Sequence, residues 1–337
     1  MADRLAPGAP YRTLDLNGVT APFYIVPFDK DGVCTGPLTA RNLVETVADH
    51  RPTDVFLFSH GWNNYWQAAT SRYDEFITGF ARMRSEHPLD REFRPVLVGV
   101  IWPSTALVMP WERGPQILGV DRDDDAVAEE RAEIAEVAAI VPEEERARFY
   151  ELAQRPADLT DQEAAEFAGL VVGAFGGDDE LGLVEPDAES VLEVWQSLPG
   201  RPANDGTVPD LSDIGLPGAT PAEGPDAAAA GLLKALDPRG LVRLATVLLM
   251  KDRAGRVGGR GVAELLEDLL SAGDAHVHLV GHSYGAKVVL SALVAKPHSR
   301  KVESVLLLQP AISNLCFASD ADGAGRPGGY RPALDRA

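Results

Sequence analysis

Hydrophobic positions along the chain follow two spacings, and each spacing predicts a type of element. Four apolar runs in the first hundred residues are typical of β-strands: 12–16, 22–28, 54–59 and 95–102. The last two runs are almost wholly apolar, which favours strands that are buried on both faces of a parallel sheet. Apolar residues at helical spacing predict a helix at 39–50 and another that ends near 86. The order strand, helix, strand is typical of a βαβ unit.

The same alternation returns near the C-terminus. Strands are predicted at 275–280 and 302–309, on either side of a helix at 284–295. Two further helices are predicted at 241–251 and 262–270. The glycine-rich stretch 255–261 lies between them, has no preceding strand, and is interpreted as a flexible joint.

The pattern breaks between these two parts. Acidic, helix-prone segments replace it, and they lie at 129–148 with a break at Pro142, at 158–170 and at 188–196. A stretch rich in Pro, Gly, Ala and Asp follows at 199–230 and predicts a flexible connector. We therefore expect an α/β core made of residues 1–104 and 238–337, with a long acidic helical insertion, or cap, at 105–237.

Charge is concentrated in this insertion. The chain has 51 acidic and 31 basic residues and a net charge of −20. Residues 121–193 hold 23 acidic residues and five arginines, which leaves about −2 for the rest of the chain. Duplex DNA or RNA is therefore not an expected partner, because a polyanion would be repelled. Solvated helical faces account for most such charge runs, and a surface that binds another protein is the alternative.

Composition sets further limits on the protein class. The two cysteines, Cys34 and Cys316, are too few for a disulfide framework, and no apolar run approaches the roughly 20 residues of a membrane-spanning helix. The N-terminus has no apolar stretch of the secretory type, so we expect a cytoplasmic protein without an integral membrane segment. The acidic run 121–125 is similar to the start of a calcium loop, but Ala126 and Ala132 stand at positions six and twelve of that loop. No calcium site is therefore expected there, and we expect neither another metal nor a cofactor.

The strongest chemical signal is the sequence Gly281-His282-Ser283-Tyr284-Gly285, which matches the pattern G-x-S-x-G. An apolar strand precedes it and a helix follows, so Ser283 is expected on a sharp turn that holds its hydroxyl above the sheet edge. Larger residues at 281 and 285 would collide there. The amide of Tyr284, at the helix N-terminus, would face an oxyanion formed at this serine.

A second signal, His60-Gly61-Trp62, lies at the end of the apolar run 54–59. Acyl transfer needs two backbone N–H groups directed at the developing oxyanion, and the second comes from a loop after a neighbouring strand. Gly61 allows a close approach of this loop, and the amide of Trp62 is the expected donor. We interpret His60 as a structural hydrogen-bonding residue that shapes the loop.

With these two motifs and Trp102-Pro103-Ser104, the chain resembles the α/β-hydrolase superfamily, in its lipase- and esterase-like branch. The resemblance covers roughly residues 12–104 and 238–315. It implies a mostly parallel central sheet flanked by helices, Ser283 as nucleophile, and the amides of Trp62 and Tyr284 as oxyanion hole. It also implies a catalytic acid and then a histidine after the nucleophile.

No such histidine is apparent. His298 is the only one after Ser283, and a helix roughly 18 Å long by its rise per residue would separate the two. Three aspartates in the glycine-rich tail are weak candidates for the acid: Asp320, Asp322 and Asp335. Without the insertion, about 200 residues remain for the core, which is short for eight strands and their helices. The predicted fold is therefore C-terminally incomplete.

These observations lead to two hypotheses for the function. The first is a serine hydrolase that cleaves a carboxylic ester or a related acyl bond of a small molecule through an acyl-Ser283 intermediate. Aromatic residues near the two motifs would partly line its pocket: Trp62, Tyr65, Trp66, Trp102 and Trp111. The second is a non-catalytic or truncated protein of the same fold that binds a partner through its acidic insertion.

Overall fold

The computed structural model of the chain describes residues 8–16, 18–62, 66–87, 91–104, 131–155, 159–175, 187–197, 238–321 and 323–337. Two compact units are present. We call the first the sheet unit; it comprises Met1–Gln116 and Met250–Ala337. The second, Ile117–Leu249, is called the acidic unit. The predicted bounds of the insertion, 105 and 237, lie outside the described residues.

The sheet unit is built on a six-stranded sheet in the order β1-β2-β4-β3-β5-β6. Its strands are β1 (Arg12–Asp15), β2 (Thr20–Pro27), β3 (Asp54–Ser59), β4 (Pro95–Ile101), β5 (His276–His282) and β6 (Ser304–Leu308). Only β1 is antiparallel to its neighbour; the other pairs are parallel. The predicted α/β class with a mostly parallel sheet is confirmed.

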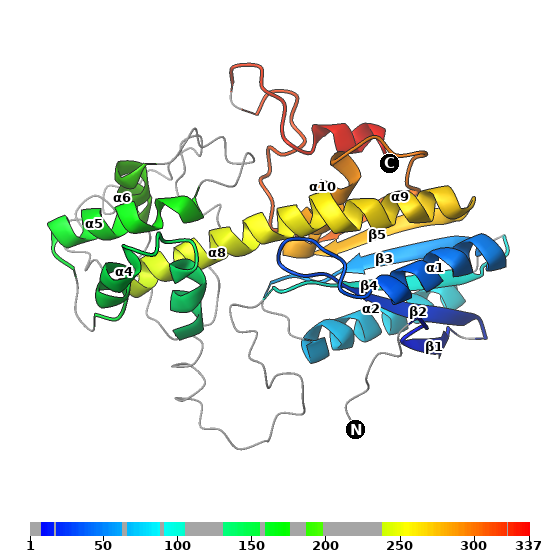
Figure 1. The fold of residues 1–337 in the computed structure, drawn as a ribbon. Helices are drawn as coiled ribbons and strands as arrows, with labels where there is room; N and C mark the ends of the chain where they lie inside the picture. The colour runs from blue at the N-terminus through cyan, green and yellow to red at the C-terminus, as the bar shows by residue number, and fades with distance from the viewer. Residues whose placement is uncertain are drawn as a thin grey trace. The chain divides into compact units, whose positions relative to one another are not determined.

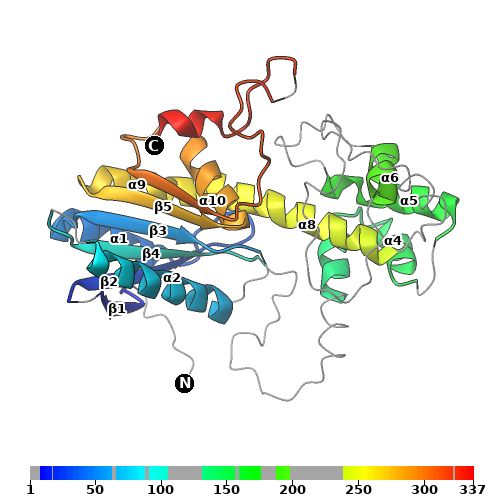
Figure 2. The ribbon, with the colours of Figure 1, turned by 180° about the vertical axis from the view of Figure 1, so that it is seen from behind.

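Helices cover both faces of this sheet (Figures 1 and 2). On one face lie α1 (Pro37–His50), α9 (Ala263–Ala272) and α10 (Tyr284–Val294), and α9 contacts both of the others. On the opposite face α2 (Trp66–Glu86) packs against the central strands. The helix at 39–50, the helix ending near 86 and the helix at 284–295 are thus confirmed, with ends that differ by a few residues.

A hydrophobic core lies between α2 and the sheet. Residues of successive strands form one hydrophobic cluster with Tyr73 of α2: Phe23, Leu97, Phe58 and Val280. The phenyl ring of Phe23 lies edge-on to Tyr73. Burial decreases toward β6, whose Ser304 and Leu306 are exposed. Strand β6 therefore forms one border of the described sheet.

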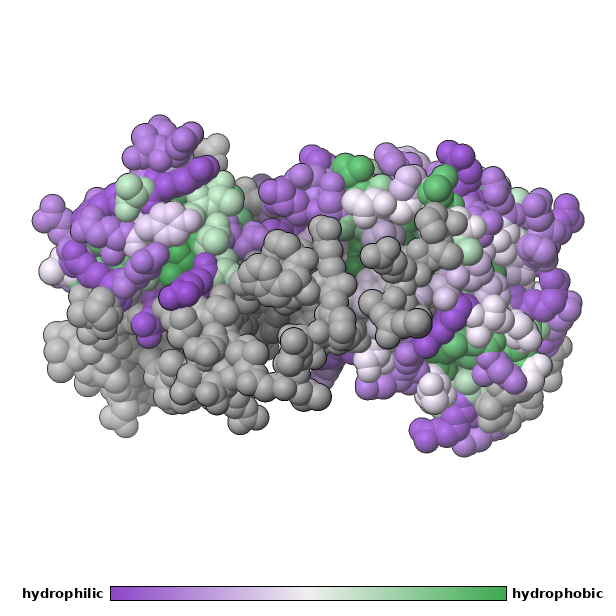
Figure 3. Space-filling view, turned by 60° about the horizontal axis from the view of Figure 1, so that its bottom comes forward, coloured by the Kyte–Doolittle hydropathy of each residue, from purple (hydrophilic) through white to green (hydrophobic). Residues whose placement is uncertain are grey.

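The acidic unit contains its own core. Its described helices are α4 (Arg146–Ala153), α5 (Asp161–Val171) and α6 (Ala188–Ser197), together with helical residues at 131–138. The rings of Phe149 and Trp195 pack against Phe167, all three buried. Hydrophilic side chains cover most of the described surface of this unit on the face in Figure 3, with a smaller apolar area between them.

The prediction of a flexible joint at 255–261 is wrong. Helix α8 (Pro238–Val257) continues through one π-helical turn, Gly258–Val262, directly into α9. The glycines there serve close packing, because a Cβ at Gly258 would lie 2.2 Å from the carbonyl oxygen of Val288 and one at Gly261 would lie 2.1 Å from that of Gly32. The glycines therefore bring this helix against its neighbours.

Several predictions fall on residues that the structure does not describe. They are the connector at 199–230, the acidic run at 121–125, Tyr65, Trp111 and Asp322. Among the helices that are described, each is too short or too polar to span a lipid bilayer.

Candidate functional site

Ser283 lies at the junction of β5 and α10 with a backbone φ of 52° and ψ of −122°. A non-glycine residue rarely adopts a positive φ, and such strain is characteristic of residues that a surrounding structure holds for function. The glycines two residues away on each side are required by close contacts. A Cβ at Gly281 would lie 2.5 Å from the Cα of Ala286, and one at Gly285 would lie 2.1 Å from the carbonyl oxygen of Ser59.

Backbone hydrogen bonds hold this turn on both sides. The amide of Ser283 donates to the carbonyl oxygen of Leu308 at 3.0 Å. Its carbonyl oxygen accepts from the amide of Ala286 at 3.0 Å and from that of Ala311 at 3.3 Å. The strained conformation is therefore fixed by the helix that follows and by the segment after β6.

The loop after β3 lies directly against Ser283. Strands β3 and β5 are neighbours with Ser59 opposite Gly281, which brings the two strand ends together. A Cβ at Gly61 would lie 2.7 Å from the Cβ of Ser283 and 3.1 Å from the carbonyl oxygen of His282. The structure thus brings together the two motifs that were singled out from the sequence, and only glycine fits at position 61 without displacement.

His60 is buried and both of its ring nitrogens are engaged. The amide of Trp102 donates to Nε2 at 3.3 Å, and Nδ1 lies 2.9 Å from the carbonyl oxygen of Gly61. Since Nε2 accepts, Nδ1 carries the proton and donates to Gly61. Burial lowers the pKa of His60 to about 4, so that the ring is neutral at pH 7 and this tautomer is retained.

This bond fixes the orientation of the peptide group that joins Gly61 and Trp62. The carbonyl and the N–H of a trans peptide point in opposite directions. Because the Gly61 carbonyl faces His60, the N–H of Trp62 points away from His60. The indole ring of Trp62 lies 6.3 Å from the ring of Tyr284, the first residue of α10.

Two further side chains position His60, and the sequence did not indicate either role. Tyr73 of α2 donates from its hydroxyl to the carbonyl oxygen of Val100 at 2.5 Å and accepts from the amide of His60 at 3.0 Å. Burial raises the pKa of Tyr73. The ring of Trp102 stacks on that of His60 at 5.4 Å, and its Nε1 donates to the carbonyl oxygen of His60. No sequence spacing connects α2 or β4 to this loop.

His282, next to Ser283, has a half-buried ring. Burial lowers its pKa, while a hydrogen bond with Gln309 acts in the opposite direction. Its Nδ1 is buried and has no hydrogen-bond partner in the described structure. Gln309, directly after β6, has a φ of 44°. The residue directly after β6 is therefore an uncharged amide and not an acid.

No described side chain fills the role of the catalytic base. His298 contacts Glu267 at 3.0 Å through Nδ1 and the carbonyl oxygen of Ala292 at 3.1 Å through Nε2, at the far end of α10. Within the described part of the chain, no histidine forms a hydrogen bond with the hydroxyl of Ser283. Asp320 accepts from the amide of Gly325, and Asp335 lies in a 3-10 helix, Arg331–Asp335.

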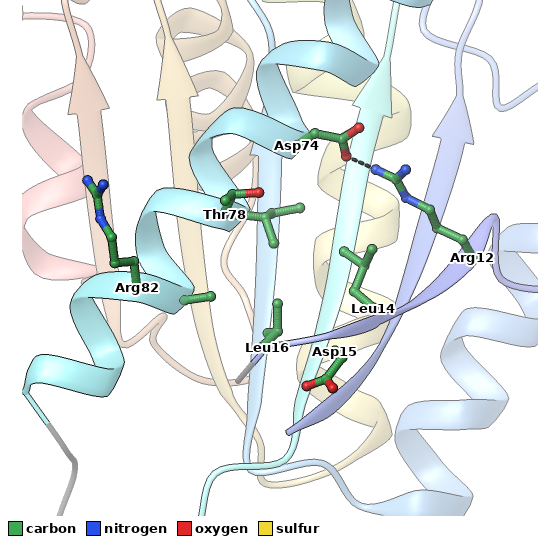
Figure 4. A pocket seen from close by; sticks show the side chains of 9 residues that line it. Arg12, Leu14, Asp15, Leu16, Asp74, Thr78 and Arg82 are labelled. Atoms are coloured by element: carbon green, nitrogen blue, oxygen red, sulfur yellow. Dashed lines mark ion pairs between the residues drawn. The ribbon is translucent and has the colours of Figure 1, made fainter. Parts of the chain in front are cut away.

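A cavity of about 580 Å³ lies elsewhere, between β1 and α2 (Figure 4). Its lining includes Leu14, Leu16, Arg82 and the ion pair of Arg12 with Asp74. None of the residues of the Ser283 site contributes to it. Among the described residues, no group of three or more His, Cys, Asp or Glu side chains could hold a metal ion.

Comparison with known proteins gave no match to a family model, to a curated protein or to a solved structure.

Proposed function

We propose that the chain is a serine hydrolase of the α/β-hydrolase type that cleaves a carboxylic ester or a related acyl bond. The observation that carries the proposal is the strained turn at Ser283, held between β5 and α10 with Gly61 packed against it. An ordinary turn needs neither a positive φ at serine nor a second loop at van der Waals contact.

In the proposed reaction the oxygen of Ser283 attacks the acyl carbon, and the amides of Trp62 and Tyr284 stabilise the negative charge that develops on the carbonyl oxygen. The position of Tyr284 at the N-terminus of α10 supports this role, since the helix dipole favours negative charge there. The bond from His60 to the Gly61 carbonyl supports the role of Trp62, because it directs the Trp62 amide away from His60.

A serine-reactive fluorophosphonate probe tests the proposal. The adduct is mapped by mass spectrometry in the wild type, in Ser283→Ala and in Ser299→Ala, where Ser299 is an exposed serine remote from the turn. We expect labelling of Ser283 at least tenfold faster than labelling of Ser299, because oxyanion stabilisation persists without a complete triad. Equal rates at the two serines would contradict the proposal.

The absence of a base among the described contacts favours a second candidate. Loss of a triad member lowers kcat by several orders of magnitude, so ester turnover by this chain is expected to be weak. In the second candidate the sheet unit is a non-catalytic scaffold, and the acidic unit binds a protein partner. Specific labelling of Ser283 would favour the hydrolase, and no labelling in a folded protein would favour the scaffold.

A further inference from the structure

Three side chains are linked by hydrogen bonds at the opposite edge of the sheet, where β3, β5 and β6 begin. The hydroxyl of Ser304 lies 2.8 Å from Nδ1 of His278. Nε2 of the same ring lies 3.1 Å from Oδ1 of Asp54. A hydroxyl, an imidazole and a carboxylate are thus linked in series, far along the strand from Ser283.

Strand pairing places these groups together. In the parallel register of β5 and β6, His278 lies directly beside Ser304, so their side chains leave the same face of the sheet. Asp54 is the first residue of β3, the other neighbour of β5. The imidazole of His278 stacks on Phe56 with ring centroids 4.5 Å apart, which restricts its rotation.

Asp54 is held as an ionised carboxylate. Its side chain is buried, yet Arg91 binds both oxygens, at 2.6 and 2.8 Å, and the hydroxyl of Thr53 donates at 2.6 Å. Burial raises the pKa of Asp54, but the hydrogen bonds from His278, Arg91 and Thr53 outweigh it and leave the pKa well below its usual range. An ionised carboxylate only accepts hydrogen bonds.

The ionised carboxylate of Asp54 determines which atom donates in each of these hydrogen bonds. Nε2 of His278 faces a carboxylate that only accepts, so Nε2 donates, and Nδ1 is the ring nitrogen that is left to accept a hydrogen bond. The hydroxyl of Ser304 therefore donates to Nδ1. This is the arrangement of a nucleophile, a general base and an orienting acid, which is defined by geometry and roles and not by sequence position. Ser304 itself is exposed.

We propose that Asp54, His278 and Ser304 form a second hydroxyl-activating site, at which small activated acyl donors acylate Ser304 independently of Ser283. In this step the Ser304 oxygen forms an ester bond with the acyl carbon, and its proton passes to His278. The bond between the acyl carbon and the leaving oxygen breaks, and the leaving group or water takes the proton from His278. Water then hydrolyses the acyl-serine.

Acetylation by p-nitrophenyl acetate in the Ser283→Ala background tests this. Site-resolved mass spectrometry measures the acetylation rates of Ser304 and of Ser299, an exposed serine that has no hydrogen bond with His278. General-base assistance contributes about 100-fold or more, so Ser304 is expected to react about 100-fold faster than Ser299. Equal rates at Ser304 and Ser299 would overturn the proposal and leave the cluster as a structural link between strands.

Two histidine variants of the same background test the role of the imidazole. His278→Gln is expected to reduce the Ser304 rate to that of Ser299, because glutamine cannot take the proton. His276→Gln is the matched control, since His276 lies on the same face of β5 but contacts Glu303 at 2.8 Å. A Ser304 rate that survives His278→Gln, or that falls equally in both variants, would refute the assignment. Because Ser283 is absent throughout, these outcomes are independent of the function proposed for it.

Discussion

At the scale of single residues, Gly61 and Ser283 depend on each other. A Cβ at position 61 would lie 2.7 Å from the Cβ of Ser283, and the two residues come from segments more than 200 positions apart in the sequence. The motif around Ser283 could be predicted because its requirements are local to one turn. The hydrogen bonds of His60 could not be predicted, because Tyr73 reaches its amide and Trp102 its ring from other elements.

Gly61→Ala is expected to slow fluorophosphonate labelling of Ser283 at least tenfold while the protein remains folded. The new methyl group would lie 2.7 Å from the Cβ of Ser283, so that either the loop or the turn must shift, at a cost of about 1–3 kcal/mol. Gly79→Ala in α2 is the control, since its Cβ would meet no atom within 4 Å. Unchanged labelling in Gly61→Ala would show that the loop and the turn do not act together.

His60 predicts a dependence of stability on pH. Its folded pKa of about 4 lies below the value of roughly 6.5 of an unfolded histidine, so the unfolded chain binds more protons between these values. The stabilisation is complete above pH 6.5 and decreases as the pH falls toward 4. Denaturant titrations are expected to show a loss of about 2 kcal/mol from this group between pH 7 and 5. His60→Gln removes this contribution, and an identical pH dependence in that variant would contradict it.

At the scale of elements, apolar runs predicted the strands well. The run at 54–59 coincides with β3, and that at 95–102 extends one residue beyond β4. Parallel strands that are buried on both faces consist almost entirely of apolar residues, so an uninterrupted apolar run is a strong indication of such a strand. The stretch 255–261 was misjudged for the opposite reason. Glycine predicts flexibility from the sequence alone, whereas the carbonyl oxygens that require it here, those of Val288 and Gly32, are distant in the chain.

The π-helical turn offers a matched pair of substitutions. Gly258→Ala is expected to lower the free energy of unfolding by about 1–3 kcal/mol, because its Cβ would lie 2.2 Å from the carbonyl oxygen of Val288 in α10. Gly259→Ala, one residue later, meets nothing within 4 Å and is expected to stabilise by roughly 0.5–1 kcal/mol. Thermal or urea denaturation of both variants measures the difference. Equal effects would mean that the close contact with α10 is not retained in solution.

At the scale of the whole molecule, the two units have separate cores. The core of the acidic unit is formed by helices α4, α5, α6 and the start of α8, and that of the sheet unit includes residues of α2 and the strands. From charge and from the interruption of the strand pattern, the sequence predicted an insertion at 105–237, whereas the two units divide at Gln116 and Leu249. It did not identify a base for Ser283, and among the described residues no histidine forms a hydrogen bond with that hydroxyl.

Phe167→Ala is expected to loosen the acidic unit alone. The ring of Phe167 is fully buried between Phe149 and Trp195, and truncation of such a ring costs about 3–5 kcal/mol. Hydrogen exchange followed by mass spectrometry should show faster exchange in α4, α5 and α6, with unchanged exchange in β3 and β5. Phe58→Ala in the sheet unit is the reciprocal control. Equal acceleration of both units by either substitution would indicate one cooperative structure.

The contacts of the three site glycines have a consequence for directed evolution. Codons 61, 281 and 285 are expected to return only glycine from a saturation library selected for reactivity, because backbone atoms or the Cβ of Ser283 occupy the space of any side chain. Position 62 should tolerate more residue types, since the peptide N–H proposed for the oxyanion hole is present in every residue except proline, while the side chain is the part expected to line the pocket. Libraries aimed at new acyl substrates can therefore place their diversity at 62 and keep the three glycines constant.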